Sequence, residues 1–299
     1  MNLETSLREL FERQARAWPL LASGIEGLQR AGTRLVQIDG FEILIRHIPH
    51  RVHSTTALVD SESVAGRPCF LCRENLPSEE EGLQFGADFS IYCNPFPIVL
   101  NHVTITHREH RPQRIGWQFG KMLDLAAALP GYFVIYNGPE CGASAPDHLH
   151  FQAGLRGLLP AEKDIARLMG LTLPNYGRNV LIFRRRSRSA LIDRFNRAIE
   201  LLAQTSINRP EPLINVMAFR EQDEWFVYLF PRAKHRPEVF HTGELTVSPA
   251  SIDLCGLFVV PMARDFEKIT AQAIAAIYRE VTLPDEEFMA VVRALENEG

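Results

Sequence analysis

The chain has 299 residues, of which 46% are apolar and 23% charged, and its formal net charge is −4. This length allows one large domain or two modest ones with a sizeable core, and the acidic balance gives no bulk attraction to nucleic acid or anionic membranes. No apolar run reaches membrane-spanning length, and five cysteines without a secretion signal argue against a disulfide framework, so we expect a cytoplasmic protein.

The first half of the chain mixes helix and strand patterns. An amphipathic helix is predicted over residues 3–30, and a β-hairpin around Asp39-Gly40 follows it over residues 35–45. Residues 66–77 form a turn-rich segment. Further strands are predicted over 89–93, 99–106, 132–136 and 148–153, a helix over 114–129, and a loop of small residues over 137–147.

The second half continues the mixture. Helices are predicted over 160–170 and 188–205, paired strands over 213–219 and 225–230 with their turn at 221–224, a strand over 257–260, and helices over 263–279 and 284–297. Because the elements do not alternate regularly and the hairpins are antiparallel, we expect an α+β fold. A boundary between two halves is placed within 155–210. We divide the chain into an N-terminal helical segment (1–33), a first half (34–158) and a second half (159–299).

Polar residues alternate along the strand predicted at 148–153. Side chains two apart on a strand share a face, so His148, His150 and Gln152 should project together. The loop before them contains Gly138, Gly142 and Ser144, and small residues let backbone amides approach phosphate oxygens closely. A neutral imidazole beside such a loop is a good nucleophile for phosphorus, and its second ring nitrogen should donate to a carbonyl or carboxylate. The alternative is a pair of structural histidines.

This segment resembles the active-site strand of the histidine-triad nucleotidyltransferases. That branch includes galactose-1-phosphate uridylyltransferase, diadenosine tetraphosphate phosphorylase and GDP-galactose phosphorylase. The resemblance implies an antiparallel sheet with flanking helices in two pseudo-related halves. It also implies that His150 is the nucleophile, that Gln152 assists the phosphate, and that Asn137, Gly142 and Ser144 bind substrate. Three residues, Ala145 to Asp147, separate Ser144 from His148, one more than in the uridylyltransferase pattern.

Cys69 and Cys72 form a two-thiol chelate at a spacing that zinc sites often use. Some uridylyltransferases complete such a site with a histidine that ends a downstream strand and with the first histidine of the His-x-His pair. The resemblance therefore implies a structural zinc held by Cys69, Cys72, His110 and His148, with His107 as the rival for the third position. The alternative is a pair of buried, reduced thiols and a free His148.

Several cationic residues are candidate phosphate contacts. Arg51 and Arg67 lie in the same family pattern and could clamp a phosphate bidentately, or could be surface charges. The segment 225–235 resembles the closing strand of the phosphorylase branch. This implies Arg232, Lys234 and His235 as contacts for a second phosphoryl group, and a solvent-facing strand end is the plainer alternative.

The resemblance implies transfer of a nucleoside monophosphate group from a nucleotide-sugar or dinucleoside polyphosphate to phosphate or a sugar phosphate, through a covalent nucleotidyl-histidine. We expect no nucleic-acid or membrane partner, and a homodimer is one option. Two alternatives stay open. One is a hydrolase, although Gln152 stands where small histidine-triad proteins carry a third histidine. The other is a non-catalytic, zinc-stabilised nucleotide-binding module. Base, sugar and acceptor depend on pocket shape, which no motif here encodes.

Overall fold

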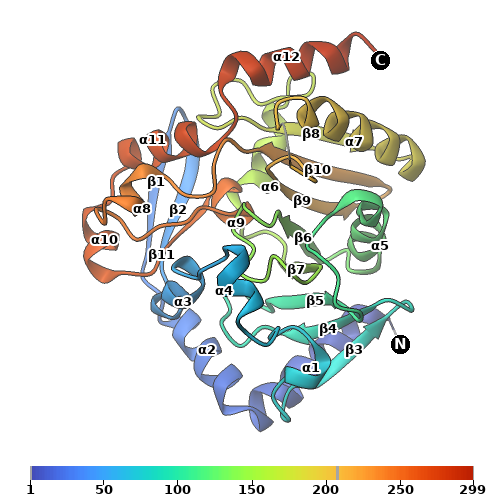
Figure 1. The fold of residues 1–299 in the computed structure, drawn as a ribbon, viewed down its shortest axis with the longest axis vertical. Coiled ribbons are helices and arrows are strands. Elements are labelled where there is room, and N and C mark those ends of the chain that lie inside the picture. The colour runs from blue at the N-terminus through green and yellow to red at the C-terminus, as the bar shows by residue number, and fades with distance from the viewer. Residues whose placement is uncertain (1, 207–208, 299) are drawn as a thin grey trace.

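The computed structural model describes residues 2–206 and 209–298, and its strands form two sheets (Figure 1). The larger sheet has eight strands in the order β3-β4-β5-β7-β6-β9-β10-β8, and every neighbouring pair is antiparallel. The smaller sheet has the order β1-β2-β11, in which β11 runs parallel to β2. The expected α+β fold with a large antiparallel sheet is confirmed.

The elements have the following bounds. The strands are β1 Thr33–Ile38, β2 Phe41–His47, β3 Gly82–Phe85, β4 Phe89–Cys93, β5 Val103–His107, β6 Tyr132–Asn137, β7 His150–Leu155, β8 Leu181–Arg185, β9 Ile214–Glu221, β10 Glu224–Pro231 and β11 Leu257–Val260. The helices are α1 Leu3–Ala17, α2 Pro19–Gln29, α3 Val52–Thr55, α4 Ser61–Ala65, α5 Phe119–Ala128, α6 Pro160–Asp164, α7 Arg188–Ala203, α8 Glu238–His241, α9 Ser251–Leu254, α10 Ala263–Lys268, α11 Ala271–Val281 and α12 Asp285–Glu296.

Two long helices expected from the sequence are each divided in the structure. The segment 3–30 breaks at Trp18, whose backbone is extended, because Pro19 starts a new helix at a position that needs no N–H donor. The segment 263–279 breaks before α11, where the Thr270 side chain accepts the N–H of Ala273 and caps the second helix. A proline at the first helical position and a side-chain cap, respectively, override the continuous apolar pattern at these two places.

The strand predicted over 148–153 also starts later than the sequence pattern indicates. Strand β7 begins at His150, so that His148 and Leu149 belong to the preceding loop. The Leu149 N–H donates to the carbonyl oxygen of Arg111, outside the ladder. The short strands β3 and β8, at the two edges of the large sheet, are absent from the sequence prediction.

Two layers cover the large sheet. Helices α1, α5, α7 and α12 cover one face, where Leu7, Phe119, Phe195 and Phe288 belong to one apolar core (Figure 1). The small sheet and helices α6, α9 and α11 lie on the other face and form a second core with Met217, Phe219 and Tyr228. Burial of these two apolar faces supplies the main driving force for folding.

Both sheets contain strands from both predicted halves. In the large sheet β6 pairs with β9, and in the small sheet β2 pairs with β11. The division at 158/159 and the relation between the halves stay predictions. None of the helices in the described part of the chain is long and apolar enough to cross a membrane.

Candidate active site

A cavity of about 700 Å³ lies over strands β4, β5 and β7. Gln152 pairs with Ile135 across β7 and β6, and Ile135 packs in the core beneath the small sheet. Directly opposed residues of antiparallel strands point to the same side, so the cavity and the small sheet share one face. His150, Gln152, Thr104 and Thr106 line its floor.

His150 has the tautomer that a nucleophile requires. Its Nδ1–H donates to the carbonyl oxygen of His148 at 2.8 Å, which leaves Nε2 with the lone pair. No hydrogen bond to Nε2 occurs within residues 2–206 and 209–298, and the residue lines the cavity. Burial lowers the pKa of His150 to about 4, so the imidazole is neutral at physiological pH. Leu149 and Phe151, its chain neighbours, are buried in the core as expected.

Gln152 is oriented by a histidine that the sequence analysis did not assign. The Nε2–H of His102 donates to Gln152 Oε1 at 2.9 Å, so the Gln152 amide nitrogen is left to donate elsewhere. His102 is 1% exposed, and burial lowers its pKa to about 3, which keeps it neutral. The only sequence signal was a histidine inside the strand predicted over 99–106.

Gln113 fixes the backbone of the active strand and was also missed. Its Oε1 accepts the N–H of His150 at 2.8 Å, and its Nε2 donates to the carbonyl oxygens of His150 and Asn137. Because Gln113 is fully buried and bonds both strand ends, it holds the start of β7 against the end of β6. Nothing in its local sequence context indicates this role.

The loop between β6 and β7 has the character of a phosphate cradle. The backbone N–H groups of Gly142, Ser144 and Ala145 donate to no acceptor in the part of the chain that the structure describes. Gly142 has a φ of +95°, and a Cβ there would lie 2.6 Å from the Cβ of Ala250, so only glycine fits. Ser144 lines the cavity, and Gly142 lines a small adjoining recess.

The Asn137 side chain, at the end of β6, is held by β9 and α9 rather than projecting freely. Its Oδ1 accepts bonds from Asn215 Nδ2 and from the backbone and hydroxyl of Ser251, at 2.7 to 2.9 Å. Asn137 also lines the recess. Its side-chain oxygen is already occupied by protein donors, so the expected contact of Asn137 with substrate stays a prediction.

The three predicted phosphate-binding arginines have different surroundings. Arg51 lines both cavity and recess, and its guanidinium makes no hydrogen bond or ion pair within the described residues. Arg67 lines the cavity and pairs with Asp147 at 3.1 Å. Arg232 lies outside the cavity and is buried among acceptors that include Asn215 Oδ1 and the carbonyl oxygens of Val281 and Pro249. Lys234 pairs with Glu280, at 2.9 Å.

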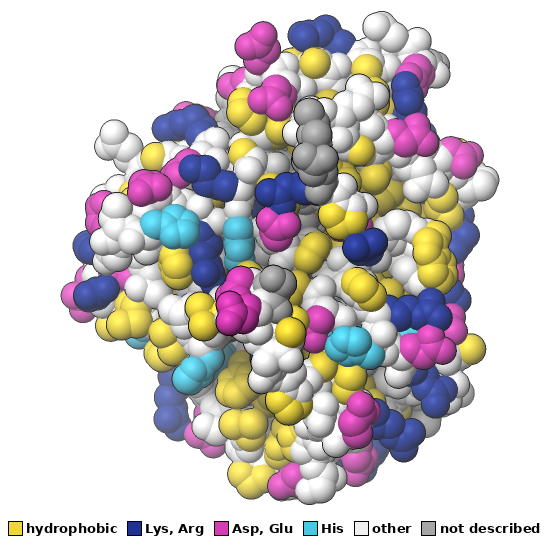
Figure 2. Space-filling model, in the orientation of Figure 1, with side chains coloured by type: hydrophobic (Ala, Val, Ile, Leu, Met, Phe, Trp, Pro, Cys, Tyr) yellow, Lys and Arg dark blue, Asp and Glu magenta, His cyan; other side chains and the backbone are white. Residues whose placement is uncertain are grey.

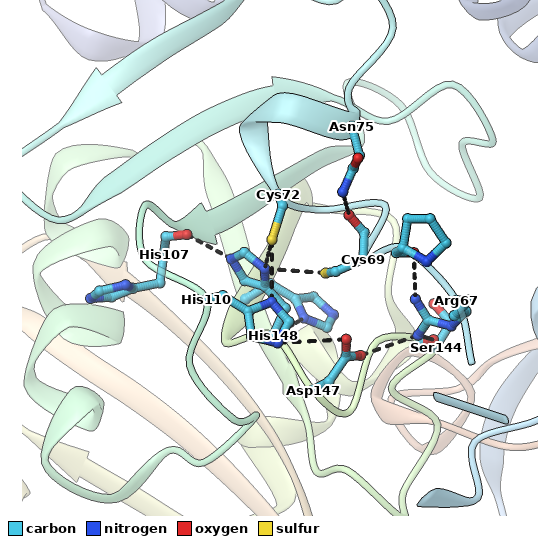
Figure 3. Close-up of polar contacts among 11 residues, drawn as sticks. Arg67, Cys69, Cys72, Asn75, His107, His110, Ser144, Asp147 and His148 are labelled. Carbon is cyan, nitrogen blue, oxygen red and sulfur yellow. Dashed lines mark hydrogen bonds and ion pairs between the residues drawn. The ribbon is translucent and has the colours of Figure 1, made fainter. Parts of the chain in front are cut away.

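The four predicted metal ligands converge beside the active strand (Figure 3). One ligand atom from each of Cys69, Cys72, His110 and His148 lies within 4.8 Å of the other three. The Cys69 Sγ lies 3.3 Å from His148 Nδ1, and the Cys72 Sγ lies 3.2 Å from His110 Nδ1. The cluster could therefore hold a metal ion.

The surroundings of the cluster fit a metal. The Nε2–H of His148 donates to the carbonyl oxygen of His107 at 2.7 Å, so Nδ1 presents its lone pair to the thiols. A backbone acceptor behind a ligating histidine is the usual way to fix its tautomer. His107 contributes this carbonyl, while its ring packs edge-on against Phe89 outside the cluster. His110 rather than His107 thus stands at the third position.

Asp147 connects the cluster to the cavity. It lies in the stretch that separates Ser144 from His148, pairs with Arg67, and has its second oxygen 3.8 Å from His110 Nε2 (Figure 3). Arg67, which lines the cavity, and His110, which belongs to the cluster, therefore both lie beside the Asp147 carboxylate.

Comparison with known proteins agrees with this fold. Residues 10–155 match the family described as a domain of unknown function, DUF4922, and residues 165–297 match the family "GDPGP1-like, C-terminal domain". No curated protein sequence matches the chain. Yeast Ap4A phosphorylase Apa2 has a similar structure, with a TM-score of 0.64 and 16% identity, over 93% of this chain and 97% of that one.

Two further structures of the yeast enzyme are similar as well. The complex with AMP has a TM-score of 0.61 and 16% identity over 93% and 96% of the two chains. The complex with Ap4A has a TM-score of 0.64 and 14% identity over 93% and 98%. The chain therefore shares the fold of the yeast phosphorylase, and its C-terminal part matches the GDPGP1-like C-terminal domain.

Proposed function

We propose that the protein is a phosphorylase that transfers a nucleoside monophosphate group through His150. One observation carries the proposal: His150 is buried and neutral, its Nδ1–H is held by the His148 carbonyl oxygen, and its Nε2 has no partner within the described residues. A structural histidine would have both nitrogens bonded, because buried polar groups are normally satisfied. An unbonded, unprotonated nitrogen in a cavity is available to attack.

The transfer has two displacements. Nε2 of His150 attacks the α-phosphorus of a nucleoside diphosphate-sugar or dinucleoside polyphosphate, forming a P–N bond while the P–O bond to the leaving phosphate breaks. A phosphate or sugar phosphate oxygen then attacks the same phosphorus and releases His150. Each step inverts the configuration at phosphorus, so the complete reaction retains it.

The surrounding groups suit a phosphate that gains negative charge in the transition state. The Gln152 amide nitrogen and the unbonded amides of the loop are neutral donors that need not reorganise. Arg51 adds an unpaired positive charge beside them, which can neutralise a leaving or accepting phosphate. Ser144 and Arg67 complete this set of cavity groups.

We also propose that the cluster of Cys69, Cys72, His110 and His148 holds a structural zinc ion. Two thiolates and two imidazoles form a closed tetrahedral set, which leaves no position for substrate. Bound there, zinc would fix the backbone on which His150 lies, since His148 both joins the cluster and accepts the His150 Nδ1–H through its carbonyl oxygen.

The relatives support a phosphorylase over other uses of the fold. The similar yeast structures are of an Ap4A phosphorylase, and the C-terminal part matches a GDPGP1-like domain. These likenesses do not identify the base or the leaving group. Those depend on the cavity wall of this chain.

The test uses a panel of nucleotide-sugars and dinucleoside polyphosphates with inorganic phosphate as acceptor. We expect product formation that depends on added phosphate, and a mass increase of one nucleoside monophosphate on the intact protein when acceptor is omitted. His150→Gly and the closer mimic His150→Asn should lose at least about 10⁴-fold in turnover, whereas the exposed His241→Asn should retain it. Full turnover by a folded His150→Gly variant would show that the mechanism is wrong.

A further inference from the structure

Two segments of the chain meet beside the cavity, and the cluster of Cys69, Cys72, His110 and His148 takes ligands from both. Cys69 belongs to the turn-rich segment 66–77, and His148 lies in the loop between β6 and β7. The Cys69 Sγ lies 3.3 Å from the His148 Nδ1. A metal ion bound by the cluster would therefore cross-link these two segments.

A charged pair joins the same two segments (Figure 3). Arg67 lies two residues before Cys69, and Asp147 directly precedes His148. The Arg67 Nη2 donates to Asp147 Oδ1 at 3.1 Å and to the carbonyl oxygen of Ser144 at 3.4 Å. The position of the Arg67 guanidinium thus depends on how the two segments are held relative to each other.

The Asp147 carboxylate also lies beside the cluster, at His110. The His110 Nδ1 lies 3.2 Å from the Cys72 Sγ, so its Nε2 is on the far side of the ring, where it lies 3.8 Å from Asp147 Oδ2. A carboxylate behind a ligating histidine fixes the orientation of the ring and raises its basicity. The Asp147 side chain is 16% exposed and makes no other hydrogen bond or ion pair among residues 2–206 and 209–298.

Arg67 has a donor left for a ligand. A guanidinium carries five N–H groups, and the Arg67 Nε–H has no acceptor in the part of the chain that the structure describes. The residue lines the cavity, with its guanidinium 4.9 Å from the centre of the Phe70 ring. Figure 2 shows hydrophobic side chains gathered in the region of α2 and α4, and α4 ends two residues before Arg67. Weaker screening by water beside such side chains strengthens the attraction between the guanidinium and an anion.

The pair of Arg67 and Asp147 is weak on its own. Partly exposed ion pairs contribute little to stability, because the ordering of two flexible side chains offsets their attraction. A metal ion that holds both backbones and orients Asp147 through His110 would supply that order in advance. An anion bound to Arg67 would order the same groups, so each ligand would favour the binding of the other, and the coupling is reciprocal.

Resting on the proposed zinc site, we infer that Asp147 is a positioning residue that couples metal binding at the cluster to ligand binding in the cavity. Metal at the cluster holds Arg67 toward the cavity through Asp147. The phosphate chain of a nucleotide bound to Arg67 then strengthens metal binding by the same factor by which the metal strengthens nucleotide binding.

The first measurement is the binding of ADP and of GDP to the full chain by titration calorimetry, with zinc bound and after chelation. Chelation should weaken binding to the wild type about 10-fold. Arg67→Met and Asp147→Ala should bind more weakly already with zinc, and chelation should then change their affinity less than about twofold. Glu74→Ala, which removes an exposed carboxylate two residues after Cys72, should behave as the wild type.

The second measurement is zinc affinity by competition with a chromophoric chelator, which needs no nucleotide. Asp147→Ala should weaken zinc binding about 10- to 100-fold, and Glu74→Ala less than about threefold. Addition of the nucleotide should strengthen zinc binding in the wild type by the factor found in calorimetry and should have no such effect in Arg67→Met.

Two results would overturn the inference: the same effect of chelation on nucleotide affinity in the wild type and in Arg67→Met, or equal zinc affinities in Asp147→Ala and Glu74→Ala. Should the chelated wild type fail to fold, or neither nucleotide bind, the zinc affinities decide. A wild type that binds no zinc overturns the inference together with the zinc site. No measurement here requires turnover, so a phosphorylase with uncoupled sites would reject only the role of Asp147, and a coupled protein without transfer would reject only the proposed reaction.

Discussion

Two regions of the molecule contain buried or half-buried polar side chains, and they differ in how far those side chains are bonded. Around Arg232, in the second half, the guanidinium donates to Asn215 and to backbone carbonyl oxygens, and Asn215 in turn donates to Asn137. Around the cavity, His150 Nε2 and the Arg51 guanidinium have no partner within the described residues. The sequence suggests phosphate binding for both arginines, but the structure gives them opposite surroundings.

The difference separates residues that hold the fold from residues available to a ligand. A fully bonded polar network in a low-dielectric interior stabilises one arrangement, and removing a member leaves its partners unsatisfied. A buried group without a partner costs stability unless something else binds it. The groups around the cavity therefore indicate a ligand, and the groups around Arg232 indicate structure.

The cluster of Cys69, Cys72, His110 and His148 is an intermediate case, because its side chains contact one another and could also hold a metal ion. We expect zinc in the purified protein. Chelation should lower the free energy of unfolding by about 4 kcal/mol, the value for free metal at a thousand times its Kd. Urea unfolding with and without chelator, together with elemental analysis, measures both quantities.

A matched pair of cysteine variants tests the assignment of the ligands. Cys69→Ser should lose the metal, whereas Cys93→Ser, at a buried thiol outside the cluster, should retain it. If the protein purifies without metal and chelator leaves its free energy of unfolding unchanged, the proposed zinc site is wrong. Protein contacts alone would then hold the cavity in shape.

The second prediction exchanges the two arginines for methionine. Arg232→Met should cost about 3 kcal/mol of stability, because Asn215 Oδ1 and several carbonyl oxygens lose their donor. Arg51→Met should change stability by less than about 0.5 kcal/mol and lower kcat/KM by about 100-fold. Thermal melts measure the stability of both variants, and phosphorolysis rates measure their kcat/KM. Similar losses of stability in Arg51→Met and Arg232→Met would contradict the proposed difference between the cavity and the surroundings of Arg232.

Local spacing predicts the alternating polar residues over 148–153 and the Cys-x-x-Cys pair, whereas the resemblance to a known family implied His110 and His148 as ligands. Alternation along residues 148–153 and the Cys-x-x-Cys pair are short-range signals, and the structure brings all four proposed ligands together. The sequence does not predict Gln113, His102 or the environment of Arg232, because their roles depend on partners far away in the chain. Whether a polar side chain is satisfied is a tertiary property.

The third prediction concerns pH and His102. Burial lowers the pKa of His102 to about 3, with the charges of Arg51 and His50 acting in the same direction, whereas the unfolded value is about 6.5. Below pH 6.5 the unfolded chain binds a proton that the folded chain does not, so stability falls as the pH falls. Between pH 6.5 and 5 this group should cost about 1.5 kcal/mol. His102→Gln, which cannot titrate, should lose that much less, as measured by urea unfolding at both values; an identical loss in the two proteins would contradict the prediction.

The smallest expected effect belongs to the bond that orients Gln152. His102→Leu removes the donor to Gln152 Oε1, so the amide can rotate and present its oxygen to the phosphate. We expect kcat to fall about tenfold with little change in KM, because the contact matters most as charge develops on phosphorus. His102→Gln can place an amide N–H near the position of the imidazole Nε2–H and should recover most of the loss. Steady-state kinetics of both variants distinguish positioning from packing: equal kcat in the leucine and glutamine variants, or a rise in KM alone, would mean that His102 only fills space beneath the cavity floor.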